Sequence, residues 1–194
     1  MMLIDKLIFK NIRKHISLSD TEKEFMWYLF KEIRLKRKET ILAQGQIAKK
    51  IYFVEVGSVR AYNINVDGKE STIMFAVIDW WVTDMDSFMN QSESSLTIVA
   101  LEDSQLLELP YQSLQELLVQ HPKFERFFRI LFQNAYIREQ RRALHNISMS
   151  TEERYVQFIK KYTAIVEKIT QKQIASYLGV TPEFLSALKN NADS

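Results

Sequence analysis

Cysteine is absent from the 194 residues of the chain. Its absence excludes disulfides, thiolate metal sites, cysteine-held iron–sulfur clusters and cysteine nucleophiles. Glycine and proline are scarce, with four and three residues, so each one marks a position along the chain. The composition is otherwise that of a folded protein, 46% hydrophobic and 26% charged, which excludes a disordered chain or a coiled-coil rod.

Long hydrophobic runs are also missing. The longest stretch without a charged residue is the ten residues from Gln173 to Pro182, which is far too short to cross a bilayer. Asp5 and Lys6 interrupt the N-terminal apolar residues before a signal-peptide core can develop. We therefore expect a cytoplasmic protein with no membrane partner.

The net charge of +2 is unevenly distributed. Residues 1–121 hold 14 Lys and Arg against 17 Asp and Glu, whereas residues 122–194 hold 12 against 7. A basic C-terminal third favours a polyanionic partner, although a solvated charged helix face would give the same count.

The middle of the chain has the pattern of an antiparallel sandwich or barrel. Short runs rich in Ile, Val, Phe and Tyr alternate with turn signals at roughly ten-residue spacing. Asp67-Gly68 is a hairpin signal, because both residues tolerate the positive φ of a tight primed turn. The predicted strands are 51–56, 58–64, 70–77, 96–101 and 105–109.

Helical signals flank this block. Ser19 with Glu22, Ser150 with Glu153 and Thr170 with Gln173 form capping boxes, and each proline precedes a helix-like pattern. The predicted helices are 20–31, 110–119, 122–147, one from Ser150 to about Tyr162, and the final pair beginning at Thr170.

The long helix repeats an apolar residue every seven positions. Ile130, Ile137 and Leu144 carry the repeat, although Asn134 and Arg141 interrupt the seam. The spacing favours pairing with a second copy of the helix, and packing within one chain alone is the competing interpretation.

Residues 171–190 have the helix-turn-helix pattern. Ala175 is small enough for a second helix to cross closely, and Gly179 suits a left-handed backbone at the turn. Apolar residues that would lock the helices against a third fill the remaining fixed places: Ile174, Leu178, Val180, Leu185 and Leu188. Because the second helix of such a motif enters the DNA major groove, the pattern favours DNA binding over an ordinary helical hairpin.

In order and spacing, these features resemble the Crp/Fnr family of bacterial transcription factors from about Ile8 to Asn191. The likeness includes Ile51-Tyr-Phe-Val-Glu-Val-Gly-Ser-Val-Arg-Ala-Tyr62, Asp67-Gly68-Lys69, the upstream Gly45, Ala100-Leu-Glu-Asp103 and His121-Pro122. The resemblance implies an α+β fold with an N-terminal antiparallel β-roll (jelly roll), a long dimerisation helix and a C-terminal helical helix-turn-helix domain. The expected domains are 1–121, a cyclic nucleotide-binding-like effector domain; 122–148, the dimerisation helix; and 149–194, the DNA-binding domain.

The resemblance implies a homodimeric regulator that reads palindromic double-stranded DNA, with RNA polymerase as a further candidate partner. The expected DNA contacts are Thr170, Lys172, Thr181, Glu183, Ser186 and Lys189. Pro182 and Ala187 occupy places where arginines are common in the family, which leaves Lys189 as the only cation of the reading helix. The sequence ends at Ser194, so the two-stranded wing of many relatives is expected to be absent or truncated.

The effector site departs from the family pattern as well. Thr83-Asp84 and Ser94-Ser95 stand where cyclic-AMP binders carry Gly-Glu and Arg-Ser or Arg-Thr, and no Arg or Lys lies between Lys69 and Leu109. A buried phosphate needs compensating charge, so cyclic AMP is not the expected effector and no cofactor is assigned. Trp80 and Trp81 are either core residues or walls of a pocket for a less charged ligand. The candidate pocket residues are Thr83, Asp84, Ser94, Ser95, Arg60, Glu139 and Gln140.

Two other classes of function remain to be compared with DNA binding: an enzyme and an interaction module. An enzyme is not expected, because His15, His121 and His145 are far apart and have neither metal-ligand spacing nor a nucleophile motif near them. The remaining alternative is a dimeric ligand-sensing or protein-interaction module with degenerate DNA binding.

Overall fold

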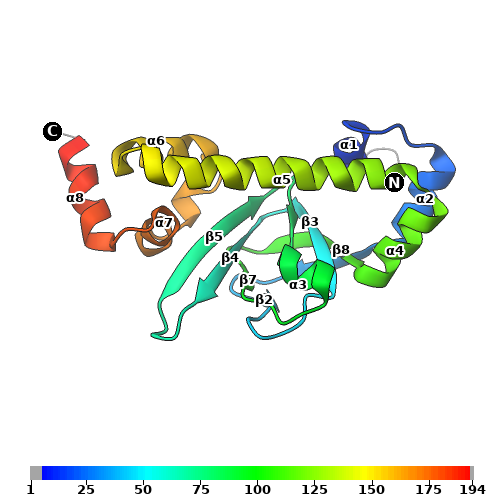
Figure 1. Cartoon of the computed structure of the whole chain (residues 1–194), viewed down its shortest axis with the longest axis horizontal. Helices are drawn as coiled ribbons and strands as arrows, with labels where there is room; N and C mark the ends of the chain where they lie inside the picture. Colours follow the sequence, from blue (N-terminus) through cyan, green and yellow to red (C-terminus); the bar gives the residue numbers. More distant parts are fainter. Residues whose placement is uncertain (1–5, 193–194) are drawn as a thin grey trace.

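Two four-stranded antiparallel sheets pack face to face and form the β-roll (Figure 1). The structure is a computed structural model and describes residues 6–192. One sheet has the strand order β1-β8-β3-β6 and the other β2-β7-β4-β5. The strands are β1 (Lys31–Leu35), β2 (Thr40–Leu42), β3 (Lys50–Val56), β4 (Ser58–Ile64), β5 (Glu70–Val77), β6 (Trp81–Val82), β7 (Thr97–Ala100) and β8 (Ser104–Pro110).

Helices surround the roll and continue beyond it. Before it lie α1 (Leu7–Arg13) and α2 (Asp20–Leu29), and α3 (Met85–Asn90) stands between β6 and β7. After it come α4 (Tyr111–Gln120), α5 (Lys123–Ser148), α6 (Thr151–Lys161), the 3-10 turn η2 (Val166–Lys168), α7 (Gln171–Leu178) and α8 (Pro182–Ala192). Helix α5 runs along most of the length of the molecule and connects the roll to the C-terminal helices (Figure 1).

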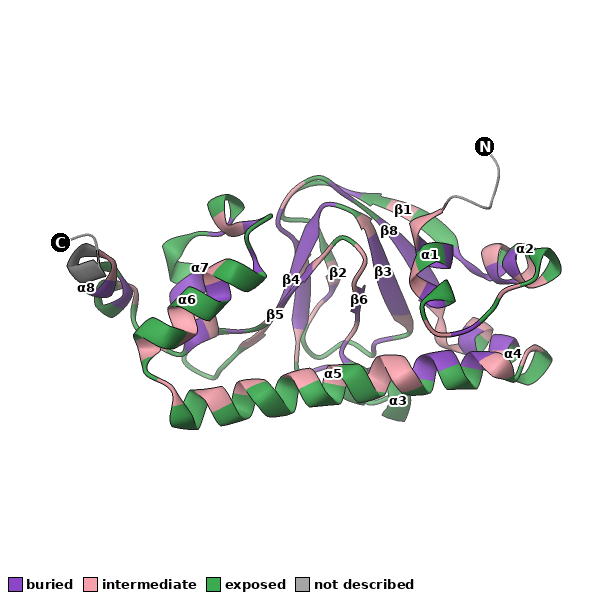
Figure 2. Cartoon of the chain, turned by 90° about the horizontal axis from the view of Figure 1, so that it is seen from above, coloured by how far each residue is buried: buried purple, intermediate pink, exposed green. Residues whose placement is uncertain are grey.

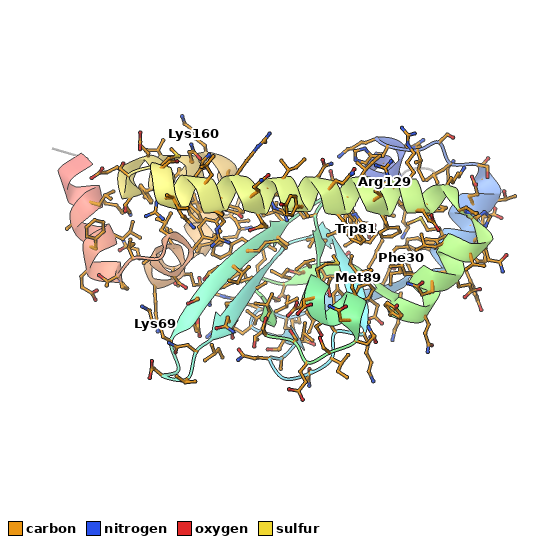
Figure 3. The ribbon with its side chains drawn as sticks, viewed as in Figure 1. Phe30, Lys69, Trp81, Met89, Arg129 and Lys160 are labelled. Carbon is orange, nitrogen blue, oxygen red and sulfur yellow. The ribbon has the colours of Figure 1, made fainter. Side chains whose placement is uncertain are left out.

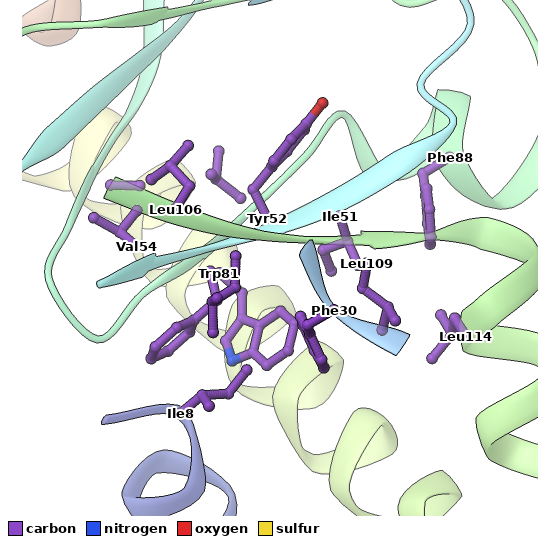
Figure 4. Packing of buried hydrophobic residues seen from close by; sticks show 14 of the residues in the cluster. Ile8, Phe30, Ile51, Tyr52, Val54, Trp81, Phe88, Leu106, Leu109 and Leu114 are labelled. Atoms are coloured by element: carbon purple, nitrogen blue, oxygen red, sulfur yellow. The ribbon is translucent and has the colours of Figure 1, made fainter. Parts of the chain in front are cut away.

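The main core fills the space between the two sheets and the first half of α5. Trp81 lies in it, with ring centroids 5.3 Å from Phe53, 5.9 Å from Phe127 and 5.7 Å from Phe128. Figure 4 shows Trp81 among Phe30, Ile51 and Leu109 in the same core. The indole Nε1 donates to Asn11 Oδ1 at 3.1 Å, so the one polar atom of this buried ring is satisfied. Trp81 is therefore a core residue.

The expected fold class is confirmed, and the predicted strands and helices are present with bounds shifted by a few residues at most. Strands β1, β2 and β6 and helices α1 and α3 are additional to the predicted elements. The helix expected over 20–31 ends at Leu29, because Phe30 is extended and Lys31 already pairs with Glu108 of β8. The hairpin at Asp67-Gly68 joins β4 to β5, with Gly68 at φ +77°.

Helix α5 changes environment along its length. Phe124, Phe127 and Phe128 are buried near its start, whereas Ile137, Leu144 and Ile147 are 41%, 59% and 87% exposed. Figure 2 shows the same change from buried to exposed along the helix. The expected division into residues 1–121, 122–148 and 149–194 stays a prediction.

Within residues 6–192, no helix is long and apolar enough to cross a membrane.

Candidate nucleic-acid interface and effector site

Helices α7 and α8 form the helix-turn-helix. Gly179 adopts φ +73°, a left-handed conformation that costs other residues energy, and it turns the chain between the two helices. The Val180 amide donates to the Ala175 carbonyl at 3.0 Å and closes the turn. Ala175 is fully buried and packs in one core with Leu178, Leu185 and Phe158 of α6. The third helix that the pattern requires is thus α6.

The N-termini of α7 and α8 are capped by the hydroxyl groups of two expected DNA contacts, Thr170 and Thr181. Thr170 caps α7, with its Oγ1 accepting from the Gln173 amide at 3.2 Å, while Gln173 Oε1 accepts from the Thr170 amide at 3.0 Å. Thr181 Oγ1 accepts from the Phe184 amide at 3.2 Å at the start of α8. Both hydroxyl protons remain available to an acceptor such as a phosphate oxygen.

The six expected DNA contacts all lie on α7, on α8 or at their N-caps. Thr170, Lys172, Thr181, Glu183 and Ser186 are exposed, and Lys189 is half-buried. The structure therefore brings these residues into one helical unit, and their role as DNA contacts stays a prediction.

This unit is docked on the outer face of the β-roll, a contact that the sequence pattern did not reveal. Phe75 of β5 is fully buried, with ring centroids 5.9 Å from Phe158, 5.4 Å from Tyr162 and 5.7 Å from Tyr177. Lys168 forms an ion pair with Glu102 at 2.6 Å across the same boundary. The aromatic cluster is a second core, shared between the roll and the helices.

Polar contacts continue the docking along the edge of β5. Ser176 Oγ accepts from the Thr72 amide and donates to the Glu70 carbonyl, both at 2.8 Å. Arg142 of α5 donates to the carbonyl oxygens of Thr72 at 3.2 Å, of Tyr177 at 3.3 Å, and of Ile73. Side chains thereby bind main-chain groups at the edge of the sheet.

The segment that departs from the pattern of cyclic-AMP binders contains a buried carboxylate of the chain itself. Asp84 is buried at the start of α3, and its Oδ2 accepts from the Ser95 amide at 3.0 Å and the Ser94 hydroxyl at 2.8 Å. Its Oδ1 faces the Ser87 amide at 3.4 Å. Thr83 Oγ1 donates to the Lys50 carbonyl at 2.9 Å. The structure therefore brings Thr83, Asp84, Ser94 and Ser95 together, with the serine donors directed at the aspartate.

A cavity of about 540 Å³ lies between this segment and α5. Trp80, Trp81, Met74 and Phe132 form part of its apolar wall. Its charged lining residues among those described are Asp79, Arg138 and Glu139, of which Arg138 is the only cation. Arg138 Nε pairs with Glu139 Oε1 at 3.1 Å, and the guanidinium lies 5.0 Å from the centre of the Trp80 ring. Trp80 thus forms part of the pocket wall.

Five of the seven expected pocket residues do not line this cavity. Thr83 and Glu139 line it, whereas Asp84, Ser94 and Ser95 lie beside it and Gln140 is exposed on α5. Arg60 is buried in a different environment, where it pairs with Glu70 at 2.6 Å, donates to Thr72 Oγ1 at 2.9 Å and lies over the ring of Tyr62. Its charge is already balanced there. Arg138 lines the cavity although it is not among the seven residues expected from the sequence.

Within the described residues, no cluster of three or more His, Asp or Glu side chains has an arrangement that could hold a metal ion.

Residues 32–121 match the family model of the cyclic nucleotide-binding domain. The anaerobic regulatory protein of Pasteurella multocida is 26% identical over 165 residues, which cover 79% of this chain and 60% of that protein. The chain thus spans about 60% of that relative's length.

Two solved structures have a similar fold. The c-di-GMP responsive global regulator CLP of Xanthomonas campestris aligns with a TM-score of 0.73 and 17% identity, over 90% of this chain and 93% of that one. The catabolite activator protein of Thermus thermophilus aligns with a TM-score of 0.58 and 21% identity, over 90% and 84% of the two chains. The resemblance expected from the sequence is therefore confirmed: residues 32–121 match the cyclic nucleotide-binding domain, the sequence is similar to that of a regulatory protein, and the fold is shared with a solved structure described as a protein of the crp/fnr family.

Proposed function

We propose that the chain is a homodimeric, DNA-binding transcriptional regulator controlled by an effector bound to the β-roll. The observation that carries the proposal is the helix-turn-helix of α7 and α8, whose reading side chains Thr181, Glu183 and Ser186 are exposed. Relatives of similar sequence are named as regulators, which supports the same class.

Dimerisation is supported by the apolar side chains that α5 leaves in solvent. Ile137, Leu144 and Ile147 are exposed on a helix that also contributes buried residues to the core. Exposed apolar residues at heptad spacing are a seam for a second copy. A two-fold dimer would place its two reading helices about one helical turn of DNA apart, roughly 34 Å, which fits a palindromic operator.

The salt dependence of binding to the DNA upstream of the coding region tests the function. A regulator that neutralises phosphates with Lys172 and Lys189 loses affinity steeply as salt rises, because binding releases condensed counterions. Saturable binding with such a slope is the expected result. No binding to any duplex, or binding without a salt slope, would favour the protein-interaction module instead.

The reading residues can be separated from the phosphate contacts. Lys189→Gln is expected to weaken binding to all sequences alike, whereas Glu183→Ala or Ser186→Ala changes the preference at particular base pairs by about 1–3 kcal/mol each. Selection of binding sites from a randomised duplex pool measures both effects. Unchanged base preferences for Glu183→Ala would contradict the assigned reading edge.

We further propose that the effector is less charged than cyclic AMP. Asp84 already uses the Ser94 and Ser95 donors, and a phosphate placed beside it would meet a buried negative charge. The Trp80 and Phe132 wall of the 540 Å³ cavity suits a planar or apolar molecule. Calorimetric titration with cyclic AMP and cyclic GMP is expected to show no binding tighter than high micromolar. A saturable low-micromolar isotherm would contradict this part of the proposal and would direct attention to Arg138 and Arg60.

A further inference from the structure

A second and larger hollow lies on the other side of Arg138, where α5, α6 and α7 meet. It has a volume of about 770 Å³. Six arginine and lysine side chains line it: Arg138, Arg141, Arg142, Arg154, Lys160 and Lys161. We call it the basic cleft. Figure 3 places Lys160 on α6 beside the far half of α5, well away from Arg129 near the start of that helix.

The charge of the basic cleft is poorly balanced by the protein. Among the described residues that line it there is no carboxylate. The neighbouring Glu139 pairs with Arg138 at 3.1 Å and faces Arg142 at 3.6 Å, so one acid serves two arginines. The side chains of Arg141 and Lys160 form no ion pair or hydrogen bond with any residue from 6 to 192. Several cations thus share a concave site with little compensation.

Two side chains show the consequence of this crowding. Burial, together with the nearby Arg138 and Arg142, lowers the pKa of Lys161 to about 8, which means that its positive charge is disfavoured in place. Arg154 is held by the Leu178 carbonyl at 2.8 Å and by Asn146 Oδ1 at 3.0 Å, yet its buried Nε has no partner among the described residues. An anion in the cleft would stabilise the positive charge of Lys161 and could accept a hydrogen bond from Arg154 Nε.

The remaining wall of the basic cleft is partly polar, with Asn134, His145, Asn146 and Gln157, and partly apolar. Phe158, Tyr177, Leu178 and Ile137 line it, and the guanidinium of Arg142 lies 4.3 Å from the centre of the Tyr177 ring. Planar guanidinium groups bind phosphate oxygens in pairs, and aromatic walls stack on planar rings.

We propose that the basic cleft binds a small anion that carries two or more linked phosphate groups, such as the phosphate chain of a nucleotide. The cations outnumber what one phosphate can use, because a single dianionic group accepts from only a few donors at once. The basic cleft adjoins the effector cavity at Arg138, which lines both hollows, and it does not rest on DNA recognition by α8.

Isothermal calorimetry on the full chain at 0.15 M NaCl tests the proposal with sodium tripolyphosphate, ATP and orthophosphate as probes. Tripolyphosphate and ATP are expected to bind saturably, and orthophosphate at least ten-fold more weakly. Equal affinity for the first two assigns the site to the phosphate chain alone, and tighter ATP binding adds recognition of the nucleoside by the Phe158 and Tyr177 wall. Both results support the site.

The matched variants remove the same charge at two places on the molecule. Arg141→Gln with Lys160→Gln takes two cations from the basic cleft and is expected to weaken tripolyphosphate binding at least ten-fold. Arg126→Gln with Arg129→Gln takes two exposed cations from the other end of α5 and is expected to change it less than two-fold. Sedimentation checks that both pairs keep the association state of the parent protein.

Three results would overturn the site. These are the absence of tripolyphosphate and ATP binding up to millimolar concentration, an equal loss in both variant pairs, and a cleft pair that loses only duplex-DNA affinity. The last result would make the cleft a surface for the DNA backbone. Because the probes are titrated without DNA, failure here leaves the proposed regulator function untouched, and failure of the operator assay leaves this site untouched.

Discussion

The two halves of α5 belong to one continuous helix but differ in burial and in the parts of the protein that they contact. Phe124, Phe127 and Phe128 of the first half complete the core of the β-roll. The second half buries no side chain completely, leaves Ile137 and Leu144 in solvent and lines the basic cleft with its arginines. The difference shows that tertiary contacts support the two halves unequally: the first half packs into the core of the roll, whereas the second half contacts β5 through polar bonds of Arg142.

The largest effect is expected when an aromatic core side chain is removed from the first half of α5. Phe127→Ala is expected to lower the free energy of unfolding by about 3–5 kcal/mol, because Phe127 is fully buried against Trp81 and Phe128. Urea denaturation measures the loss. Arg126→Ala, its exposed neighbour, is the control and is expected to stay within about 0.5 kcal/mol of the parent. Equal losses at the two positions would contradict the assignment of the first half to the core.

A substitution in the second half of α5 is expected to change the association of two chains more than the stability of the fold. Ile137→Glu would place a charge in the proposed seam and cost several kcal/mol of dimerisation free energy once desolvation is counted. Sedimentation at micromolar concentration is expected to show a dimer for the parent protein and a monomer for the variant. Val156→Glu changes an apolar side chain of similar exposure on α6 and should leave the dimer intact. A monomeric parent protein would remove the seam altogether.

The start of α5 is also expected to be sensitive to acid. Burial raises the pKa of Glu22, but hydrogen bonds from Lys123 and Ser19 outweigh it and hold the pKa at about 2, against an ordinary 4.5. A carboxyl with a lowered pKa stabilises the fold above its unfolded value, so this contribution is present above about pH 4.5 and is lost as the pH falls toward 2. Unfolding free energies measured from pH 6 to pH 2 should decline less steeply for Glu22→Gln. An identical decline would show that Glu22 does not clamp α2 to α5.

The smallest expected effect lies just after the second half. Ser150 caps α6 by accepting from the Glu153 amide at 3.2 Å, while Glu153 accepts from the Ser150 amide at 2.8 Å. Ser150→Ala is expected to lower the stability of α6 by about 1 kcal/mol, whereas Ser150→Thr should keep most of the capping contribution. Amide hydrogen exchange in α6 reports the loss locally. Protection that is unchanged in Ser150→Ala would show that the box adds nothing to this helix.

Features that rest on neighbouring residues could be predicted from the sequence. The capping boxes at Ser19, Ser150 and Thr170 and the left-handed turn at Gly179 involve contacts over three to five positions, and all of them are present. Strand β1 was missed because its residues, Lys31 to Leu35, are mostly polar and exposed and are held only by distant pairing with β8.

The candidate sites were less accessible to sequence reasoning. That Asp84 would accept from Ser94 and Ser95 depends on how the loop after α3 returns, which no local pattern encodes. The docking of Phe75 depends on two separate segments meeting, since alternation along β5 marks a face as apolar but does not say what covers it. Arg60 was expected in the effector pocket, yet its guanidinium is buried and pairs with Glu70 and Thr72 instead.

Strand β5 stands at the edge of its sheet, and Ser176 and Arg142 bind main-chain groups of Glu70, Thr72 and Ile73 along it. An open sheet edge is a template on which another extended chain can add and on which aggregation begins. Any motion that carries α7 away from the roll uncovers that edge. The docked helices therefore protect the protein against intermolecular strand addition. In the absence of DNA, a variant whose C-terminal helices are released from β5 is expected to lose solubility before it loses its fold.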